Sequence, residues 1–206
     1  MKSKLIVLIV AIILVIGIGG YIMINSNDKP KIEEPNTEVN DKNEDNVVTK
    51  KVLVLYYSLT GNTEKVANFI HEEVGGDIVK LETIKTYPSN YNELINEAQD
   101  EQRNNFRPEL KTVIENIDEY DTIFLGYPNW WADMPMSIYS FLDNYDLSGK
   151  TIAPFITHGG SGISGTPNNI QREEADATVT EGLAVSGSSA ENSKDLVINW
   201  LDRIGF

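Results

Sequence analysis

The chain has 206 residues and no cysteine, and its 31 acidic side chains outnumber its 17 basic ones, which gives a formal net charge of −14. The lack of cysteine excludes a lipid-modified cysteine at the N-terminus. A strongly acidic chain repels the phosphates of nucleic acids and attracts basic partners, so we expect no nucleic-acid partner.

Residues 1–24 combine a basic start with a long apolar segment. Lys2 and Lys4 precede a run from Leu5 to Ile24 without a charged residue. Twenty helical residues at about 1.5 Å each extend about 30 Å, the thickness of a bilayer core. We therefore expect an uncleaved transmembrane anchor. A cleaved signal peptide is the alternative, because Gly17-Ile18-Gly19 is a small-x-small site, but the apolar run continues beyond it.

The orientation of this segment is less strongly indicated. Lys2 and Lys4 precede it and Lys29 and Lys31 follow it, so the basic residues on its two sides nearly balance. A short basic tail before a hydrophobic core is typical of a signal anchor. We therefore expect a single-pass protein of the cell membrane with its C-terminal domain outside the cytoplasm. The alternatives are a domain that faces the cytoplasm and, after cleavage, secretion.

The next segment, residues 25–49, is rich in Asn, Asp, Glu, Lys and Pro. Such a composition buries too little apolar surface to offset the entropy of ordering, so we expect a flexible acidic linker. Residues 50–206 are enough for one domain with a substantial core.

This domain begins with an apolar strand, a small polar loop and a helix. Residues 52–55 are a β-branched-rich apolar run, and apolar residues recur at helical spacing from Val66 to Val74, before Gly75-Gly76. A loop at a helix N-terminus binds anions, because free N–H groups and the helix dipole converge there. The loop lacks the lysine of a nucleotide-binding P-loop and the three glycines of a dinucleotide site. Its neutral donors suit one phosphate monoester without a metal ion.

The loop Ser58-Leu59-Thr60-Gly61-Asn62-Thr63, following a hydrophobic strand, resembles the FMN-phosphate loop of flavodoxins. The resemblance covers residues 51–206 and implies FMN as the cofactor. It also implies a flavodoxin-like three-layer α/β sandwich with a five-stranded parallel sheet of order 2-1-3-4-5. Alternating strands and helices independently favour a mostly parallel sheet covered on both faces. The structural alternative is an ordinary strand-to-helix turn capped by Ser58 or Thr60.

A long polar segment separates the next two predicted strands, Asp77–Ile84 and Asp121–Gly126. It contains a helix from about Glu93 to Asn104. Tyr87 and Tyr91 precede this helix and could cover a ligand, but we expect them to pack the helix onto the sheet.

Two adjacent tryptophans follow the third strand, in the sequence Pro128-Asn129-Trp130-Trp131. Tryptophan in a polar loop at the carboxyl end of a strand suits a flat ligand that needs a stacking surface. The loop resembles the flavin-ring loop of a flavodoxin-like subfamily with a Pro-Asn-Trp-Trp motif. We also expect one of the two tryptophans, without choosing which, to pack the loop against a helix that begins near Pro135 and includes residues 138–142.

The fourth predicted strand, Thr151–Ile156, leads into a glycine-rich loop. Glycine lets a backbone approach a ligand closely, and the corresponding loop of flavodoxin-like proteins contacts the ring and the ribityl chain. His158 could donate to the flavin or relay a proton, although a structural role is more common for a lone histidine. The candidate cofactor-binding residues of this loop are His158, Gly159, Gly160, Ser161 and Gly162.

The rest of the chain completes five strand units. We expect a helix around Ile170–Ala177, a strand at Leu183–Ser186, and a terminal helix with Trp200 in the core.

These features favour a membrane-tethered FMN protein that transfers electrons, with a redox partner protein or a quinone as its partner. One alternative is an FMN-dependent reductase of quinones or similar small acceptors, with substrate beside Trp130 and Trp131. A second alternative is a flavin-free interaction module on the same scaffold. The long segment before the third strand and the Trp-Trp loop depart from small carrier flavodoxins, which leaves the reductase open.

Overall fold

The computed structural model describes residues 50–206. The expected anchor, residues 1–24, and the expected linker, residues 25–49, lie outside the described residues. Within residues 50–206, no helix combines the length and the apolar character needed to cross a membrane.

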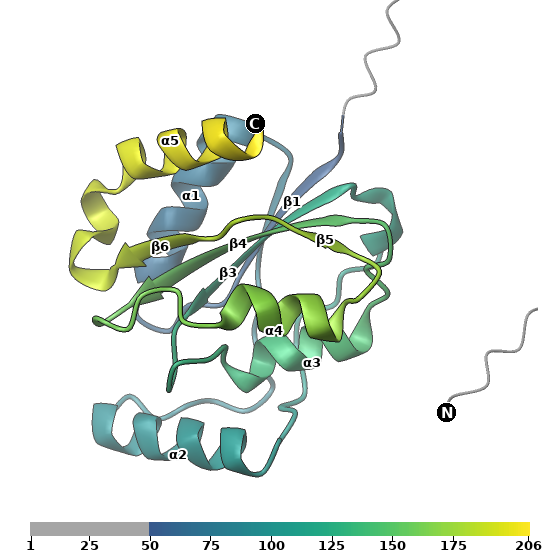
Figure 1. The fold of residues 1–206 in the computed structure, drawn as a ribbon. Helices are drawn as coiled ribbons and strands as arrows, with labels where there is room; N and C mark the ends of the chain where they lie inside the picture. The colour runs from purple at the N-terminus through teal and green to yellow at the C-terminus, as the bar shows by residue number, and fades with distance from the viewer. Residues whose placement is uncertain (1–49) are drawn as a thin grey trace, which may run out of the picture. The chain divides into compact units, whose positions relative to one another are not determined.

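Strands and helices alternate along most of the described chain (Figure 1). The strands are β1 (Val52–Tyr56), β2 (Asp77–Lys80), β3 (Thr122–Pro128), β4 (Thr151–His158), β5 (Thr178–Val179) and β6 (Leu183–Ser186). The helices are α1 (Asn62–Val74), α2 (Tyr91–Arg103), α3 (Met136–Asn144), α4 (Thr166–Glu173) and α5 (Lys194–Ile204). Two short 3₁₀ helices are η1 (Ile117–Glu119) and η2 (Gly187–Asn192).

The strands form one parallel sheet in the order β2-β1-β3-β4-β5, with β6 also paired to β4. The expected order is confirmed, but two short strands share the fifth position. Pro154 explains the division. Ile152 accepts a hydrogen bond from Thr180 N at 3.0 Å on this edge of β4, and Pro154 follows two residues later on the same side without an N–H to donate.

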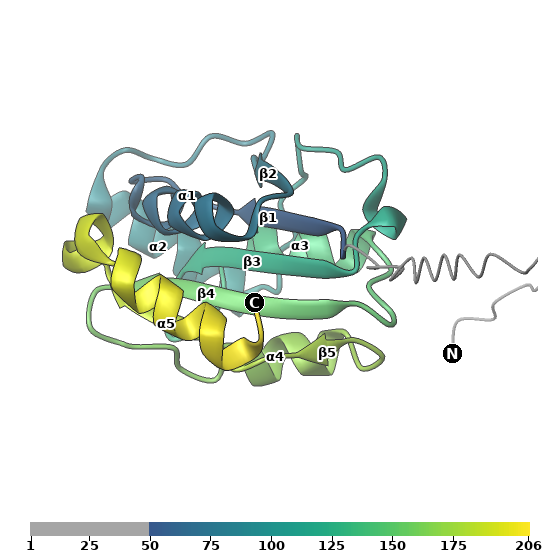
Figure 2. The ribbon, with the colours of Figure 1, turned by 90° about the horizontal axis from the view of Figure 1, so that it is seen from above.

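Helices cover both faces of the sheet (Figures 1 and 2). α1 and α5 bury Val66, Ile70 and Trp200 against one face. α3 and α4 bury Phe141 and Ile170 against the other. Trp200 is fully buried, as expected. This three-layer arrangement leaves the carboxyl ends of β1, β3 and β4 at one end of the sheet.

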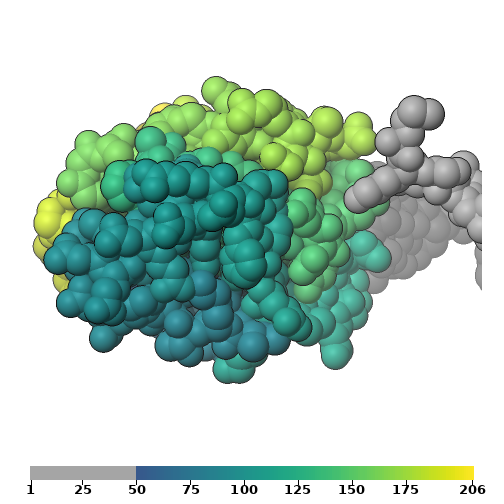
Figure 3. Space-filling view, turned by 90° about the horizontal axis from the view of Figure 1, so that it is seen from below, coloured from purple at the N-terminus to yellow at the C-terminus, as the bar shows by residue number. Residues whose placement is uncertain are grey.

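Helix α2 lies to the outside of the layer formed by α3 and α4 (Figure 1). The segment that contains it, drawn in teal, covers much of the face seen in Figure 3. The helix starts two residues earlier than expected, because the Asn90 side chain accepts hydrogen bonds from Asn92 N and Glu93 N and caps it. Because α2 lies outside the layer of α3 and α4 and not directly on the sheet, the expectation that it packs onto the sheet is wrong, although its Leu94 packs against the buried core.

The two tyrosines near α2 have different environments. Tyr87 is buried in the core, as expected. Tyr91 is 72% exposed, so the expectation that it packs against the sheet is wrong. Tyr87 packs within the core, whereas Tyr91 lies in the first turn of α2 and is largely exposed to solvent.

Two other predicted elements are displaced. The second strand ends at Lys80 instead of Ile84, because the chain beyond it pairs elsewhere: Thr83 forms an antiparallel bridge with Leu110. The fourth helix spans Thr166–Glu173 instead of Ile170–Ala177. A proline at its N-terminal end favours the earlier start, because a helix needs no N–H there.

Candidate functional site

A cavity of about 590 Å³ opens where the loops after β1, β3 and β4 meet. Its volume is within the range of small-molecule sites, about 300–1,000 Å³. Eleven of the predicted site residues line it: Ser58, Leu59, Thr60, Asn62, Thr63, Pro128, Asn129, Trp130, Trp131, His158 and Gly159. Gly61, Gly160, Ser161 and Gly162 belong to the same loops but are not among the lining residues. The three predicted loops thus come together in space.

The loop from Ser58 to Thr63 presents backbone donors at the start of α1. Gly61 adopts φ 86°, a left-handed conformation that favours glycine, and its N–H donates to Ser58 Oγ at 3.1 Å. Within residues 50–206, the N–H groups of Asn62 and Thr63 take part in no hydrogen bond. Unpaired N–H groups at the positive end of the α1 dipole can bind an anion.

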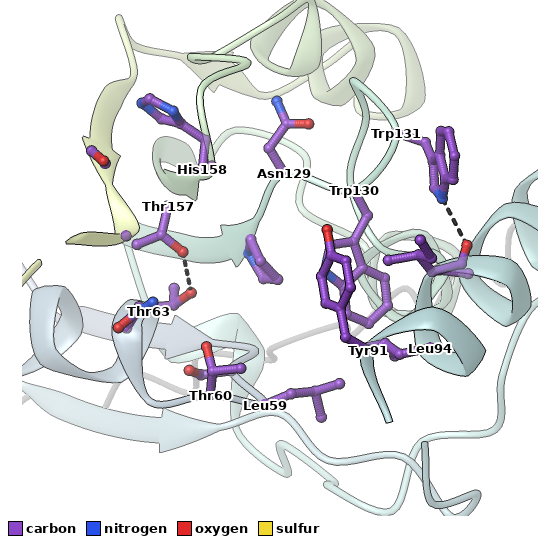
Figure 4. Close-up of a pocket in the computed structure, with 18 of the residues that line it drawn as sticks. Leu59, Thr60, Thr63, Tyr91, Leu94, Asn129, Trp130, Trp131, Thr157 and His158 are labelled. Atoms are coloured by element: carbon purple, nitrogen blue, oxygen red, sulfur yellow. Dashed lines mark hydrogen bonds between the residues drawn. The ribbon is translucent and has the colours of Figure 1, made fainter. Parts of the chain in front are cut away.

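Thr157, at the end of β4, ties this loop to the neighbouring strand. Its Oγ1 lies 2.8 Å from Thr63 Oγ1, and both residues are buried (Figure 4). Sequence analysis did not select Thr157, although its position immediately before His158 was a signal. The pair fixes the first turn of α1 against β4, at one end of the cavity.

The Trp-Trp loop is a tight turn closed by two backbone hydrogen bonds between Trp130 and Asp133, of 2.9 and 3.0 Å. Trp131 and Ala132 have φ of 54° and 62°, so they occupy the two central positions of a type I′ turn. Glycine or asparagine usually holds these positions. The Asp133 carboxylate accepts hydrogen bonds from Tyr139 and Asn169, which anchors the turn to α3 and α4.

The two tryptophan rings differ in their surroundings. Trp130 packs edge-on against Tyr57 and Tyr87, with ring centroids 5.8 and 5.6 Å away. Trp131 is 47% exposed and its Nε1 donates to Ile95 O of α2 at 2.8 Å. Trp130 is therefore the tryptophan held by packing. Its ring packs against these tyrosines and against the buried core. Direct packing of one tryptophan on the following helix stays a prediction.

Tyr57, whose ring contacts Trp130, carries a buried hydroxyl group. Within the described residues, its OH has no hydrogen-bond partner. Burial raises the pKa of the Tyr57 phenol, and the negative charge of Glu101 raises it further. The phenol therefore remains neutral, and its ring packs edge-on against Trp130.

The loop after β4 is held from two sides. His158 Nδ1 accepts a hydrogen bond from Gly160 N at 3.1 Å, so in the neutral ring the proton is on Nε2. Asn129 Nδ2 donates to Gly162 O at 2.9 Å and to Ser164 Oγ at 2.8 Å. Asn129 thus joins the loop after β3 to the loop after β4.

Sequence analysis missed two parts of the lining. One comes from η2 and the residue before it, Ser186, Gly187 and Ser188, which carry no motif. The other comes from α2, which contributes Tyr91, Leu94, Ile95 and Ala98. Of these, only Tyr91 was considered from the sequence, as the less favoured alternative that it covers a ligand. Their spacing of three and four residues marks one apolar helix face, and this signal was present in the sequence.

Among the residues that the structure describes, no Asp, Glu, Lys or Arg side chain lines the cavity. The lysines near α1 are engaged elsewhere: Lys65 pairs with Glu191, and Lys80 pairs with Glu64. An anion in this cavity would therefore depend on backbone N–H groups, hydroxyls and the helix dipole.

Comparison with protein families gives a match to the flavodoxin family over residues 51–204. Among curated relatives, flavodoxins of two Nostoc strains are each 26% identical over 114 residues. The match covers 53% of this chain and 52% of each relative, so the chain spans about half the length of these relatives.

Solved structures include similar proteins that align with almost their full length. A candidate flavoprotein of Bacteroides eggerthii is 32% identical, with a TM-score of 0.68, and the alignment covers 76% of this chain and 98% of that one. A flavoprotein of Lactobacillus acidophilus, solved in complex with FMN, is 25% identical, with a TM-score of 0.57 and coverage of 71% and 99%.

Proposed function

Because this chain belongs to the flavodoxin family, we propose that it binds FMN in the cavity at the ends of β1, β3 and β4 and transfers electrons through it. Bound FMN supplies the redox chemistry, since it can accept and release one or two electrons. The observation that carries the proposal is the meeting of unpaired N–H groups, hydroxyls and an aromatic ring in one cavity. The solved flavoprotein that contains FMN supports the same cofactor.

The phosphate end of the cavity fits FMN. The N–H groups of Asn62 and Thr63 are unpaired, and the Thr60 hydroxyl lies beside them on the lining. A phosphate monoester accepts hydrogen bonds through several oxygens, and charge-assisted bonds of this kind contribute about 1.5–3 kcal/mol each. We assign the loop from Ser58 to Thr63 to the phosphate.

The other two loops suit the remaining parts of the cofactor. Trp130 offers a ring already immobilised by Tyr57 and Tyr87, so little side-chain entropy would be lost when a flat ring stacks on it. His158 Nε2 provides a donor at the cavity, because Nδ1 is occupied by Gly160 N–H. Asn129 holds the loop after β3 against the loop after β4 through its hydrogen bond to Gly162 O. We assign the residues after β3 and β4 to the ring and ribityl chain, with Gly160, Ser161 and Gly162 shaping the loop.

Trp130→Leu tests this assignment. The variant should weaken FMN binding by about tenfold, because stacking on an aromatic side chain contributes roughly 1–3 kcal/mol. Flavin fluorescence should also be quenched less in the bound state. Trp131→Leu is the matched comparison and should change FMN affinity by less than threefold, as its ring is held by α2. A larger loss in Trp131→Leu than in Trp130→Leu would reverse the assignment.

We further propose that residues 1–24 tether this flavoprotein to the cell membrane, with the domain outside the cytoplasm. The uncharged run from Leu5 to Ile24 supports the tether. In cell fractionation, the full chain should sediment with membranes, and a chain starting at residue 50 without a signal should remain in the supernatant. A protease added to intact cells or spheroplasts should digest the tethered domain. Full-length protein in the soluble fraction would contradict the tether.

A further inference from the structure

Helix α2 turns its apolar face toward the cavity. Tyr91, Leu94, Ile95 and Ala98 lie at positions i, i+3, i+4 and i+7 of this helix, and all four line the cavity. An amphipathic helix normally buries such a face against a sheet or another helix. Figure 4 shows Tyr91 and Leu94 beside Trp130, at the opposite end of the view from Thr63 and Thr157. We call these four residues the α2 wall.

The α2 wall is fixed in place by polar contacts on both sides. Trp131 Nε1 donates to Ile95 O at 2.8 Å, which connects the wall to the loop after β3. Glu101, buried on the same helix, accepts a hydrogen bond from Tyr87 OH at 2.8 Å and pairs with Lys85. The wall is therefore already formed before a ligand arrives, which lowers the entropic cost of binding.

Large apolar side chains also surround the mouth of the cavity. Tyr91 is 72% exposed, Trp131 47% and Leu59 45%, and the three come from different segments of the chain. Exposed apolar groups gathered at a cavity mark a binding site. The phosphate end, by contrast, is lined by hydroxyl and amide groups. The cavity thus has one polar half and one apolar half.

Charge narrows the class of ligand that fits the apolar half. Within residues 50–206, no Lys or Arg side chain lines the cavity, and this part of the chain carries 24 acidic against 12 basic residues. An anionic substrate would meet repulsion without a compensating ion pair. An uncharged ring system would meet tyrosine, tryptophan and aliphatic surfaces.

We propose that the α2 wall is a subsite for an uncharged, flat, conjugated electron acceptor of the quinone class. The proposal rests on the proposed function, because it places this acceptor beside bound FMN. Reduction of a quinone to its quinol consumes two electrons and two protons, and flavin reduced by two electrons can supply both as it returns to the oxidised form. The occupant is a small molecule, in agreement with a cavity of about 590 Å³.

The test is a binding titration of the full chain loaded with oxidised FMN, with menadione as the probe and calorimetry as the readout. Tyr91→Ala and Leu94→Asn should each raise the Kd for menadione at least tenfold and change FMN affinity less than twofold. Asn92→Ala, on the exposed side of the same helix, is the matched control and should change neither. A naphthoquinone carrying a sulfonate should bind the unaltered protein at least tenfold more weakly than menadione.

The outcomes separate this inference from the proposed function. A full chain that does not retain FMN would contradict the proposed function. A chain that retains FMN but binds menadione equally well with and without the wall substitutions, or binds none, would overturn the inference alone. Loss of FMN affinity in Tyr91→Ala or Leu94→Asn would assign the wall to the flavin ring and would also overturn it.

Discussion

FMN should bind this protein at least a hundredfold more tightly than riboflavin, which has the same ring and ribityl chain but no phosphate. The phosphate would meet the unpaired N–H groups of Asn62 and Thr63 and the Thr60 hydroxyl. Two charge-assisted hydrogen bonds of about 1.5 kcal/mol each already correspond to a hundredfold difference. Fluorescence titrations of the flavin-free full chain with each flavin measure the ratio.

Thr60→Val provides the matched variant for this comparison. Valine retains the shape of threonine and removes only the hydroxyl, so FMN affinity should fall about tenfold while riboflavin affinity stays within twofold. Thr60 is exposed and makes no hydrogen bond within residues 50–206, so the fold should tolerate the change. Equal affinities for FMN and riboflavin in the unaltered protein would show that the loop does not hold the phosphate.

Gly126→Ala should destabilise the fold by about 3 kcal/mol or more. Gly126 lies in β3 between β1 and β4, and a Cβ there would be 2.1 Å from Cζ of the Phe155 ring. The Phe155 ring is fully buried and both residues belong to central strands, so neither the ring nor the backbone can move aside without disturbing the packed core. Denaturant unfolding of the full chain, followed by the signal of the folded domain, measures the loss.

A second substitution shows whether this overlap is the cause. Phe155→Leu alone should cost about 1–2 kcal/mol through lost packing. The double variant Gly126→Ala/Phe155→Leu should lose less stability than the two single variants together. Its loss in free energy of unfolding should be at least 1 kcal/mol smaller than the sum of the single losses, because leucine makes room for the new methyl group. Gly165→Ala, where an added Cβ meets no atom within 4 Å, should cost less than 1 kcal/mol. Strict additivity in the double variant would contradict the overlap.

The sequence predicted most of the sheet because its strands are local apolar runs, and strands followed by helices place their loops at one edge. This rule was sufficient to bring the residues after β1, β3 and β4 into one cavity. The interrupted fifth strand depends on Pro154, which was visible in the sequence but lies in β4 and acts on its neighbour. The residue pattern of the fifth strand alone does not show that its neighbour in the sheet carries a proline.

The contribution of α2 to the cavity could not be predicted with the same rule. The spacing of Tyr91, Leu94 and Ala98 indicates an apolar helix face, but that face could equally cover the sheet. Its placement depends on long-range contacts, such as Trp131 with Ile95. The turn at Trp131 and Ala132 was similarly hidden, because a type I′ turn is normally signalled by glycine or asparagine.

The most direct test of the account is a titration of the purified, flavin-free full chain with FMN, followed by visible absorption and flavin fluorescence. We expect saturation at one FMN per chain, a shift of the flavin bands and quenching of the fluorescence. An unchanged spectrum with FMN well in excess of the chain would contradict it. The cavity at the ends of β1, β3 and β4 would then belong to a flavin-free interaction module.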